Sequence, residues 1–161
     1  MSAATFTAQD LAGTHKLAAA LASSLPPESG AVIALDGPLG AGKTHFVQGV
    51  AAALGFDPAN VTSPTFVMIN EYPAARPIYH FDAYRIKDDD EFLELGVDEY
   101  FQSPGVCLVE WASRVSDCMP RELLNIEIQV VDEHVRRFEL QAKGEKYETM
   151  LRVIEENVSR R

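Results

Sequence analysis

The octapeptide Gly37-Pro38-Leu39-Gly40-Ala41-Gly42-Lys43-Thr44 constrains the fold more than any other feature of this chain. It matches G-x-x-x-x-G-K-[ST], a loop that cradles nucleotide phosphates when a strand precedes it and a helix follows it. The apolar, β-branched run at residues 31–35 predicts that strand. Apolar residues at helical spacing from Phe46 to Leu54 predict the helix, with Gly55 at its C-terminal cap. The context therefore favours a nucleotide site.

The residue types of the octapeptide explain how it would bind phosphates. Its glycines let the backbone turn sharply and approach the phosphates without a Cβ in the way. Lys43 would bring a cation to the β- and γ-phosphates, and the Thr44 hydroxyl would ligate Mg²⁺. A glycine-rich turn that binds nothing is the alternative. The expected nucleotide contacts are Gly37, Leu39, Gly40, Ala41, Gly42, Lys43, Thr44 and His45.

Length and charge narrow the class of protein. A chain of 161 residues is the length of one domain, and a hydrophobic content of 47% can supply its core. A net charge of −10 argues against direct binding of a nucleic-acid backbone and suits docking on a basic protein surface. Cys107 and Cys118 have no metal-ligand or redox spacing. With no leader or membrane-spanning run evident, we expect a cytoplasmic protein that does not bind membranes.

Hydrophobic periodicity and turn residues predict the remaining elements. The expected helices cover residues 7–25, 88–96 and 145–158, and the expected strands cover 66–72, 78–82, 106–109, 123–131 and 137–142. Thr7 or Thr14 would open the first helix, and Asp88 with Glu91 would form a capping box for the second, which Gly96 would end. Residues 66–72 and 78–82 should pair antiparallel, and the last two strands should form a hairpin. The fold class expected over residues 1–161 is a single α/β P-loop NTPase domain with a mixed central sheet flanked by helices.

Hydrolysis of a bound nucleotide requires acidic groups near the metal ion. Glu110 follows an apolar strand, and ligands bind at the carboxyl ends of such strands in open α/β sheets. We therefore expect Glu110 to serve Mg²⁺ or catalysis, with an ordinary strand-end carboxylate as the alternative. Trp111 would belong to the core, an interface or a lid over the site, and the core is the preferred interpretation.

Two other segments carry candidate site residues. Asp82 ends the strand at 78–82 and would hold Mg²⁺ or its water, while Arg85 would meet phosphate or a partner's carboxylate. A turn closed by Asp82 and Arg85 with Tyr84 packed beneath is an equally favoured alternative. Ser63-Pro64-Thr65 forms a rigid polar turn after the expected loop helix. Thr65 is predicted to sense the γ-phosphate there, against the alternative of a simple turn.

These motifs together resemble the TsaE family, the small bacterial ATPases of tRNA threonylcarbamoyladenosine synthesis. The resemblance extends from about Thr14 to Val130. It rests on residues 37–44, 62–66 (TSPTF), 79–85 (YHFDAYR), 94–101 (ELGVDEYF) and 107–111 (CLVEW). The octapeptide alone occurs in many proteins, whereas this ordered set is specific.

The resemblance implies a mononucleotide-binding α/β fold and a weak, Mg²⁺-dependent ATPase. Such a protein works with the TsaB–TsaD pair, which transfers a threonylcarbamoyl group to the adenosine beside the anticodon. ATP hydrolysis would drive or reset that pair, and tRNA contact would be left to the partners. Carried over by position, Lys43 contacts phosphate, and Thr44 and Glu110 serve Mg²⁺. Asp82 becomes a metal-side or catalytic acid, Thr65 part of a switch, and Trp111 a neighbour of the nucleotide.

The sequence departs from the family pattern at three positions. Pro38 replaces an acid, His45 replaces a second threonine, and Ala83 replaces a leucine. None of these changes removes a phosphate or metal ligand, although His45 would alter the pH response of the site. The late basic residue expected near the nucleotide is Arg136 or Arg137, with Arg137 taken as the contact.

Two other functions remain open from the sequence. Many small-molecule kinases are P-loop proteins of this size, and they carry a lid with several arginines. The chain after residue 110 offers Arg114, Arg121, Arg136 and Arg137 without an obvious lid. A nucleotide-gated interaction module, in which hydrolysis is incidental, is the second alternative.

Overall fold

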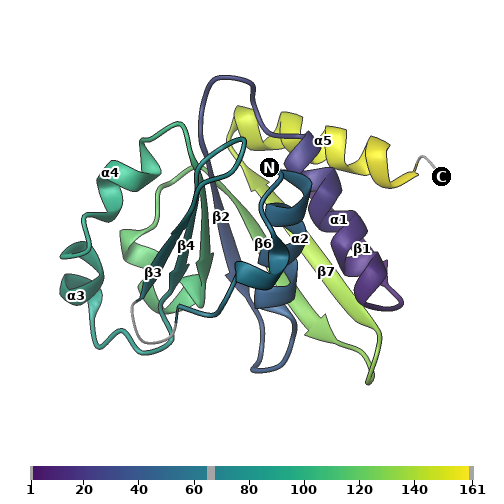
Figure 1. Cartoon of the computed structure of the whole chain (residues 1–161), viewed down its shortest axis with the longest axis horizontal. Helices are drawn as coiled ribbons and strands as arrows, with labels where there is room; N and C mark the ends of the chain where they lie inside the picture. The colour runs from purple at the N-terminus through teal and green to yellow at the C-terminus, as the bar shows by residue number, and fades with distance from the viewer. Residues whose placement is uncertain (1, 65–67, 160–161) are drawn as a thin grey trace.

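The strand that leads into the 37–44 loop lies in the middle of a seven-stranded sheet (Figure 1). The computed structural model describes residues 2–64 and 68–159. The strand order is β1-β7-β6-β2-β5-β4-β3. The strands are β1 (Ser2–Ala8), β2 (Ala31–Asp36), β3 (Ile69–Tyr72), β4 (Ile78–Asp82), β5 (Val106–Glu110), β6 (Leu123–Val130) and β7 (Arg136–Lys143).

The sheet is mixed, as expected. Strand β2 runs parallel to both β5 and β6, and β4 runs parallel to β5. Strand β3 pairs antiparallel with β4 at one edge, and β6, β7 and β1 form antiparallel pairs toward the other. Parallel strands β2, β4 and β5 therefore deliver their carboxyl ends to the same edge, beside the 37–44 loop. The α/β class with a mixed central sheet is confirmed.

Helices cover both faces of the sheet. One core contains side chains from α1 (Leu11–Ser23), α2 (Lys43–Ala53) and α5 (Glu145–Ser159). The second core contains side chains from α3 (Asp89–Leu93), α4 (Val97–Phe101) and the 3₁₀ helix η2 (Ala112–Cys118). A short 3₁₀ turn, η1 (Pro58–Asn60), follows α2. Helices α3 and α4 lie beyond β3 and β4, whereas α1 and α5 lie at the opposite end of the sheet (Figure 1).

Side-chain alternation along the central strands separates these two cores. In β2, the side chains of Ile33 and Leu35 belong to the core that contains α1, α2 and α5. Those of Val32 and Ala34 belong to the second core. Both sets are at most 3% exposed. Because β2 is buried on both faces, residues 31–35 form a continuous apolar run. That run is the pattern from which the strand was predicted.

The structure of residues 2–10 differs from the helix that was expected to begin at residue 7. Residues 2–8 form strand β1, in which Thr7 pairs with Arg137 of β7. The helix begins after Asp10, whose Oδ1 accepts a hydrogen bond from the Gly13 N–H at 2.9 Å. Neither Thr7 nor Thr14 is therefore the N-cap. Ala4 and Phe6 pack against the core with a period of two, and pairing with the edge of β7 outweighs the weak local helical pattern.

The acidic segment after residue 87 begins as expected. Asp88 Oδ1 accepts a hydrogen bond from the Glu91 N–H at 2.9 Å, which caps α3. The helix is shorter than predicted because Gly96, with φ of 74°, turns the chain into a second helix, α4. Gly96 is therefore the N-cap of α4. The two short helices place Phe92 and Val97 against the sheet.

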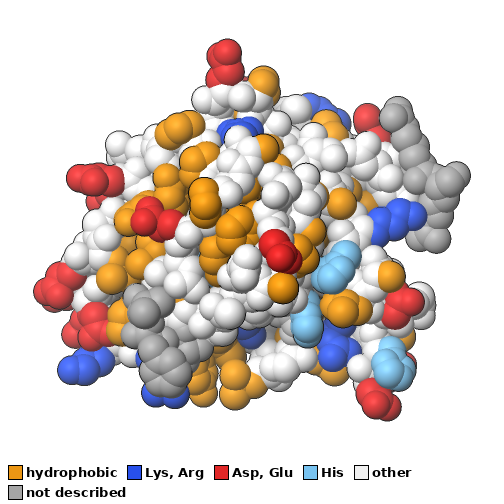
Figure 2. All heavy atoms as spheres, in the orientation of Figure 1, with side chains coloured by type: hydrophobic (Ala, Val, Ile, Leu, Met, Phe, Trp, Pro, Cys, Tyr) orange, Lys and Arg blue, Asp and Glu red, His pale blue; other side chains and the backbone are white. Residues whose placement is uncertain are grey.

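The remaining expected elements are present. Strands β3 and β4 form the predicted antiparallel pair, although residues 66 and 67 of the expected strand lie outside the described residues. Strands β6 and β7 form the late hairpin, and α5 buries Tyr147, Met150 and Leu151. Within the described chain, no helix is long and apolar enough to cross a membrane. On the face shown in Figure 2, the acidic side chains are scattered rather than gathered into one patch.

Candidate functional site

The 37–44 loop carries the turn from β2 into α2. Gly40 has φ of 78° and Gly42 has φ of 104°, a backbone region that side chains with a Cβ rarely adopt. Gly42 is the N-cap of α2, and its carbonyl accepts the first helical hydrogen bond from the Phe46 N–H at 2.9 Å. The first turn of α2 therefore presents free N–H groups and a positive dipole end at the loop, which suits an anion.

Lys43 folds back over this loop. Its Nζ donates to the carbonyl of Gly37 at 2.6 Å and to that of Pro38 at 3.1 Å, and the residue is only 5% exposed. Burial lowers the pKa of the Lys43 ammonium below its ordinary value, and the negative charge of Glu110 partly offsets this effect. A buried ammonium held by neutral carbonyls gains much from an anionic partner.

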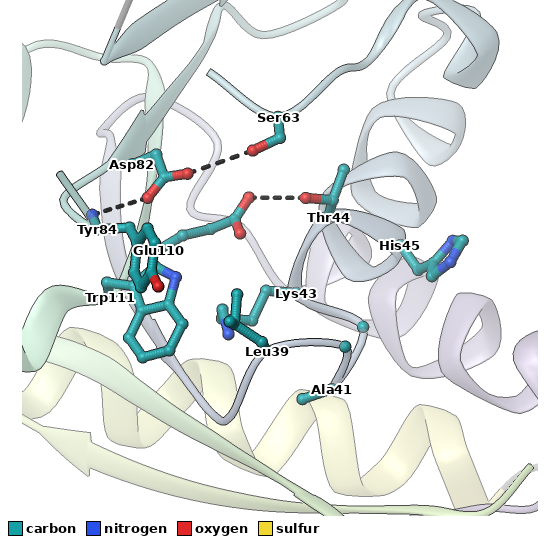
Figure 3. Close-up of a pocket in the computed structure, with 12 residues that line it drawn as sticks. Leu39, Ala41, Lys43, Thr44, His45, Ser63, Asp82, Tyr84, Glu110 and Trp111 are labelled. Atoms are coloured by element: carbon teal, nitrogen blue, oxygen red, sulfur yellow. Dashed lines mark hydrogen bonds between the residues drawn. The ribbon is translucent and has the colours of Figure 1, made fainter. Parts of the chain in front are cut away.

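Two carboxylates from neighbouring strands face the loop (Figure 3). Asp82 and Glu110 are register partners at the ends of β4 and β5, and they are 6% and 3% exposed. Glu110 Oε2 accepts a hydrogen bond from the Thr44 hydroxyl at 3.1 Å. Asp82 accepts hydrogen bonds from the Ser63 hydroxyl at 3.2 Å and from the Tyr84 N–H at 2.9 Å. The arrangement brings together Thr44, Asp82 and Glu110, the three residues predicted to serve a metal ion.

The donor set at this point fits Mg²⁺. Hydroxyl and carboxylate oxygens are the hard ligands that this ion prefers, and it usually keeps water and phosphate oxygens as further ligands. The Thr44 hydroxyl and the Glu110 carboxylate lie within hydrogen-bond distance of each other at the start of α2. A Mg²⁺ site formed jointly by protein and phosphate oxygens needs few protein ligands, and these two oxygen donors lie beside the phosphate-type loop.

His80 lies directly behind Glu110, and its motif in the sequence predicted no separate role for it. Its Nε2 lies 2.5 Å from Glu110 Oε2, and its Nδ1 lies 2.9 Å from the Tyr72 hydroxyl. The imidazole is fully buried. A histidine two residues before Asp82 in a buried strand faces the same side of the sheet, and that spacing was the available indication.

Aromatic side chains form one wall of the site. Trp111 has φ of 60°, and Lys43 Nζ lies 4.0 Å from the centre of its ring. The ring of Tyr84 lies 4.9 Å from that of Trp111, and the Arg114 guanidinium stacks 5.1 Å from Tyr84. Trp111 is partly exposed: it packs against the second core, as preferred from the sequence, and it also lines the site.

These groups surround a cavity of about 340 Å³. Its lining combines the loop and α2 with the ends of β4 and β5: Leu39, Gly40, Ala41, Gly42, Lys43, Thr44, His45, Ser63, Asp82, Tyr84, Glu110 and Trp111. Leu39 stands at its rim and is 69% exposed. The cavity has the size and polarity of a small-ligand site with convergent charged groups.

Two predicted residues have their side chains directed elsewhere, although His45 still lines the cavity. The His45 side chain points away from Lys43 and Glu110 and contacts Gln48 of its own helix at 3.1 Å (Figure 3). The exposed Arg137 donates to Gln129 rather than to the loop.

Arg136, the other residue considered, donates from Nε to the Ala41 carbonyl at 3.0 Å. Of the two candidates, Arg136 therefore faces the loop and Arg137 does not, because side chains alternate along β7. Arg85 is exposed, and Thr65 lies outside the described residues.

The two carboxylate oxygens of Asp82 have different partners. The Tyr84 N–H closes a tight turn on Asp82 Oδ1. The other oxygen, Oδ2, accepts from Ser63 at the cavity wall. Asp82 therefore stabilises its turn and still presents a carboxylate oxygen to the site.

Comparison with known proteins identifies a family that this chain matches. The model of the family described as "Threonylcarbamoyl adenosine biosynthesis protein TsaE" matches residues 8–138. The tRNA threonylcarbamoyladenosine biosynthesis protein TsaE of Bacillus subtilis is 44% identical over 136 residues, which are 84% of this chain and 81% of the relative. The TsaE protein of Haemophilus influenzae is 36% identical over 74% of this chain and 75% of its own length.

A solved structure agrees with the sequence matches. The crystal structure of Bacillus subtilis YdiB superposes with a TM-score of 0.81 at 33% identity, covering 98% of this chain and 97% of that one. The matched residues 8–138 contain the whole cavity lining described above. The chain belongs to the TsaE family, which serves threonylcarbamoyladenosine biosynthesis on tRNA.

Proposed function

We propose that this chain is a Mg²⁺-dependent ATPase whose hydrolysis drives or resets the TsaB–TsaD threonylcarbamoyl-transfer complex. The proposal rests chiefly on one observation. A phosphate-type loop carries Lys43 at its end, and the next residue, Thr44, lies 3.1 Å from the Glu110 carboxylate. Family membership connects that site to tRNA modification.

Lys43 is the main phosphate-binding side chain in this proposal. Its ammonium now donates to the carbonyls of Gly37 and Pro38, and it would exchange them for phosphate oxygens that carry full negative charge. The N–H groups at the start of α2 would bind the same phosphates. Trp111 lies 4.0 Å from the Lys43 ammonium, so its fluorescence would change when the ammonium exchanges these partners.

Thr44 and Glu110 would hold the Mg²⁺ ion, with Asp82 as the neighbouring carboxylate. When bound, the ion would neutralise charge on the phosphate oxygens. Glu110 and Asp82 are both buried acceptors, so either carboxylate is able to orient a water molecule for attack on the γ-phosphate. Ser63 fixes the orientation of Asp82 by donating to its Oδ2 at 3.2 Å.

The cavity lining supports slow turnover by the isolated chain. Among the described residues that line it, Lys43 is the only lysine or arginine. Phosphoryl transfer is accelerated strongly when a second cation meets the developing charge. A partner protein would supply this second cation, which is absent from the described lining of the cavity. The same lining gives no support to the kinase alternative, which requires several arginines around the transferred group.

Charge and thiols support the remaining parts of the proposal. With a net charge of −10, the chain would leave tRNA contact to its partners. Cys107 and Cys118 are free thiols, which fits a reducing compartment, and we place the reaction in the cytoplasm.

The test compares ATP turnover by the chain alone with turnover in the presence of TsaB–TsaD and tRNA. We expect slow hydrolysis alone and clear stimulation by the partners. Lys43→Ala should weaken ATP binding by about 100-fold, since charged hydrogen bonds contribute roughly 1.5–3 kcal/mol each. Fast turnover that ignores the partners, or unchanged ATP affinity of Lys43→Ala in calorimetry, would contradict the proposal.

A further inference from the structure

A chain of buried polar groups continues behind Glu110, away from the cavity. His80 Nε2 contacts Glu110 Oε2 at 2.5 Å, and His80 Nδ1 contacts the Tyr72 hydroxyl at 2.9 Å. Asn70 Nδ2 lies 3.4 Å from the Tyr72 oxygen and 3.3 Å from the Thr62 carbonyl. His80 is fully buried and Tyr72 is 5% exposed, so water does not replace these partners easily.

Donor and acceptor chemistry limits the directions of these hydrogen bonds. The Glu110 carboxylate accepts hydrogen bonds, so His80 Nε2 donates to Glu110 Oε2. The Tyr72 hydroxyl has two acceptors within reach, His80 Nδ1 at 2.9 Å and the Thr62 carbonyl at 3.2 Å, and we take the shorter contact as its hydrogen bond. Burial raises the pKa of this phenol, which keeps its proton in place. The two Asn70 amide hydrogens are left for the Tyr72 oxygen and the Thr62 carbonyl.

The chain ends on the segment that also holds the second carboxylate. Thr62 is followed by Ser63, whose hydroxyl donates to Asp82. Residues 61–64 are thus bonded to Asp82 directly and to Glu110 through Asn70, Tyr72 and His80. A shift of this segment would change the hydrogen bonds of both site carboxylates.

We propose that His80 and Tyr72 are positioning residues that fix the Glu110 carboxylate against Thr44 and, through Asn70, link its orientation to residues 61–64. This inference rests on the proposed ATPase function. Groups that orient a metal-binding carboxylate typically contribute 10- to 100-fold to activity or metal affinity without touching the substrate. The side chains of His80, Tyr72 and Asn70 do not line the cavity described above.

Two conservative substitutions separate positioning from packing. Tyr72→Phe removes the hydroxyl and keeps the ring, which stacks on Phe56 with ring centres 5.0 Å apart. Tyr79→Phe is the matched control, since that ring packs against Tyr100 on the other face of the sheet. We expect Tyr72→Phe to lower kcat for partner-stimulated ATP hydrolysis by about tenfold with little change in KM for ATP. Tyr79→Phe should behave as wild type.

Two substitutions of His80 test the direction of the chain. His80→Gln places an amide N–H near the former Nε2, and His80→Asn places an amide oxygen near the former Nδ1. Only the first can still donate to Glu110, so it should retain more turnover than the second. Adding Tyr72→Phe to His80→Gln should cost little further, because the connection to Tyr72 is already broken. Equal losses in the two His80 variants would overturn the proposed direction.

A spectroscopic measurement judges the chain without relying on ATP hydrolysis. Nitrogen-15 NMR of the imidazole should show a hydrogen-bonded proton on His80 Nε2, and Tyr72→Phe should shift the Nδ1 resonance. An unprotonated Nε2, or a wild-type kcat for Tyr72→Phe, would overturn the inference. If the wild-type chain hydrolyses no ATP even with TsaB–TsaD, the proposed function fails instead, and the NMR measurement still decides whether the chain of hydrogen bonds exists.

Discussion

At the scale of single residues, buried charge is concentrated at one place. Among the described residues, the buried charged side chains are Lys43, Asp82 and Glu110, and all three line the same cavity. Burying charge is costly unless it is paired and hydrogen-bonded. Such a cluster is therefore expected where function requires it, and buried charged groups that converge in one cleft indicate a functional site.

Arg136 gives a prediction at this scale. Its guanidinium donates to the Ala41 carbonyl at 3.0 Å and to the Gly40 carbonyl at 3.4 Å, so it braces the loop from the β7 side. We expect Arg136→Ala to weaken ATP binding by about tenfold, since hydrogen bonds from charged groups contribute roughly 1.5–3 kcal/mol. Calorimetric titration with ATP measures this effect. Arg137→Ala, on the exposed face of the same strand, is the control, and a larger loss there would reverse the assignment.

At the scale of elements, α2 is held in place by close packing on α1. A Cβ added to Gly49 would lie 2.7 Å from Ala18 Cβ and 3.2 Å from the His15 Cα, both on α1. Neither atom belongs to the far end of a flexible side chain, so the helices would have to separate. Because α2 begins at the 37–44 loop, its position on α1 also sets the position of that loop.

Gly49→Ala should therefore destabilise the protein despite the better helix propensity of alanine. Overpacking typically costs roughly 1–3 kcal/mol, which exceeds the gain of about 1 kcal/mol from replacing a helical glycine. Urea unfolding measures the change. Ala52→Gly, at an exposed position of the same helix, should cost only about 1 kcal/mol. A stabilised Gly49→Ala would show that the helices do not pack this closely.

The elements that the sequence predicted well are those with strong local patterns. The 37–44 octapeptide with its flanking strand and helix, the late hairpin and α5 all carry clear periodicity or turn residues. Strand β1 was missed because its alternation is short and its stability comes from pairing with β7, far away in sequence. Helix α4 was missed because Gly96 starts a helix as well as following one.

The site was predictable where position in the sheet determines it. Asp82 and Glu110 were expected at strand ends, and the parallel pairing of β4 with β5 places them side by side. The contact of His80 with Glu110, and the choice between Arg136 and Arg137, depend on side-chain direction across strands distant in sequence. No local pattern specifies such contacts, so these parts required the structure.

At the scale of the whole molecule, the central strands should open only when the protein unfolds. Cys107 lies in β5 between β2 and β4 and is fully buried, and burial raises its pKa to about 12. Cys118 is partly exposed at the end of η2. Thiolates react and thiols do not, so the two cysteines should differ in reactivity.

In native protein at pH 8, we expect an aromatic disulfide reagent to label Cys118 first. Cys107 should react at least about 1000-fold more slowly, because its labelling waits for unfolding. The absorbance of the released thiolate measures both rates. Cys118→Ser should remove the fast phase. Fast reaction of two thiols in the native protein would contradict the buried position of β5.

The most direct test of the central claim is multiple-turnover tRNA modification with the Glu110→Gln variant. The substitution keeps the size of the side chain and removes the negative charge that faces Thr44. In a reaction with TsaB–TsaD, tRNA and limiting enzyme, we expect the variant to bind ATP, to hydrolyse it poorly and to stop after about one round of threonylcarbamoyladenosine formation. Sustained modification at the wild-type rate by Glu110→Gln would show that hydrolysis at this site is incidental, and that the protein acts as a nucleotide-gated interaction module instead.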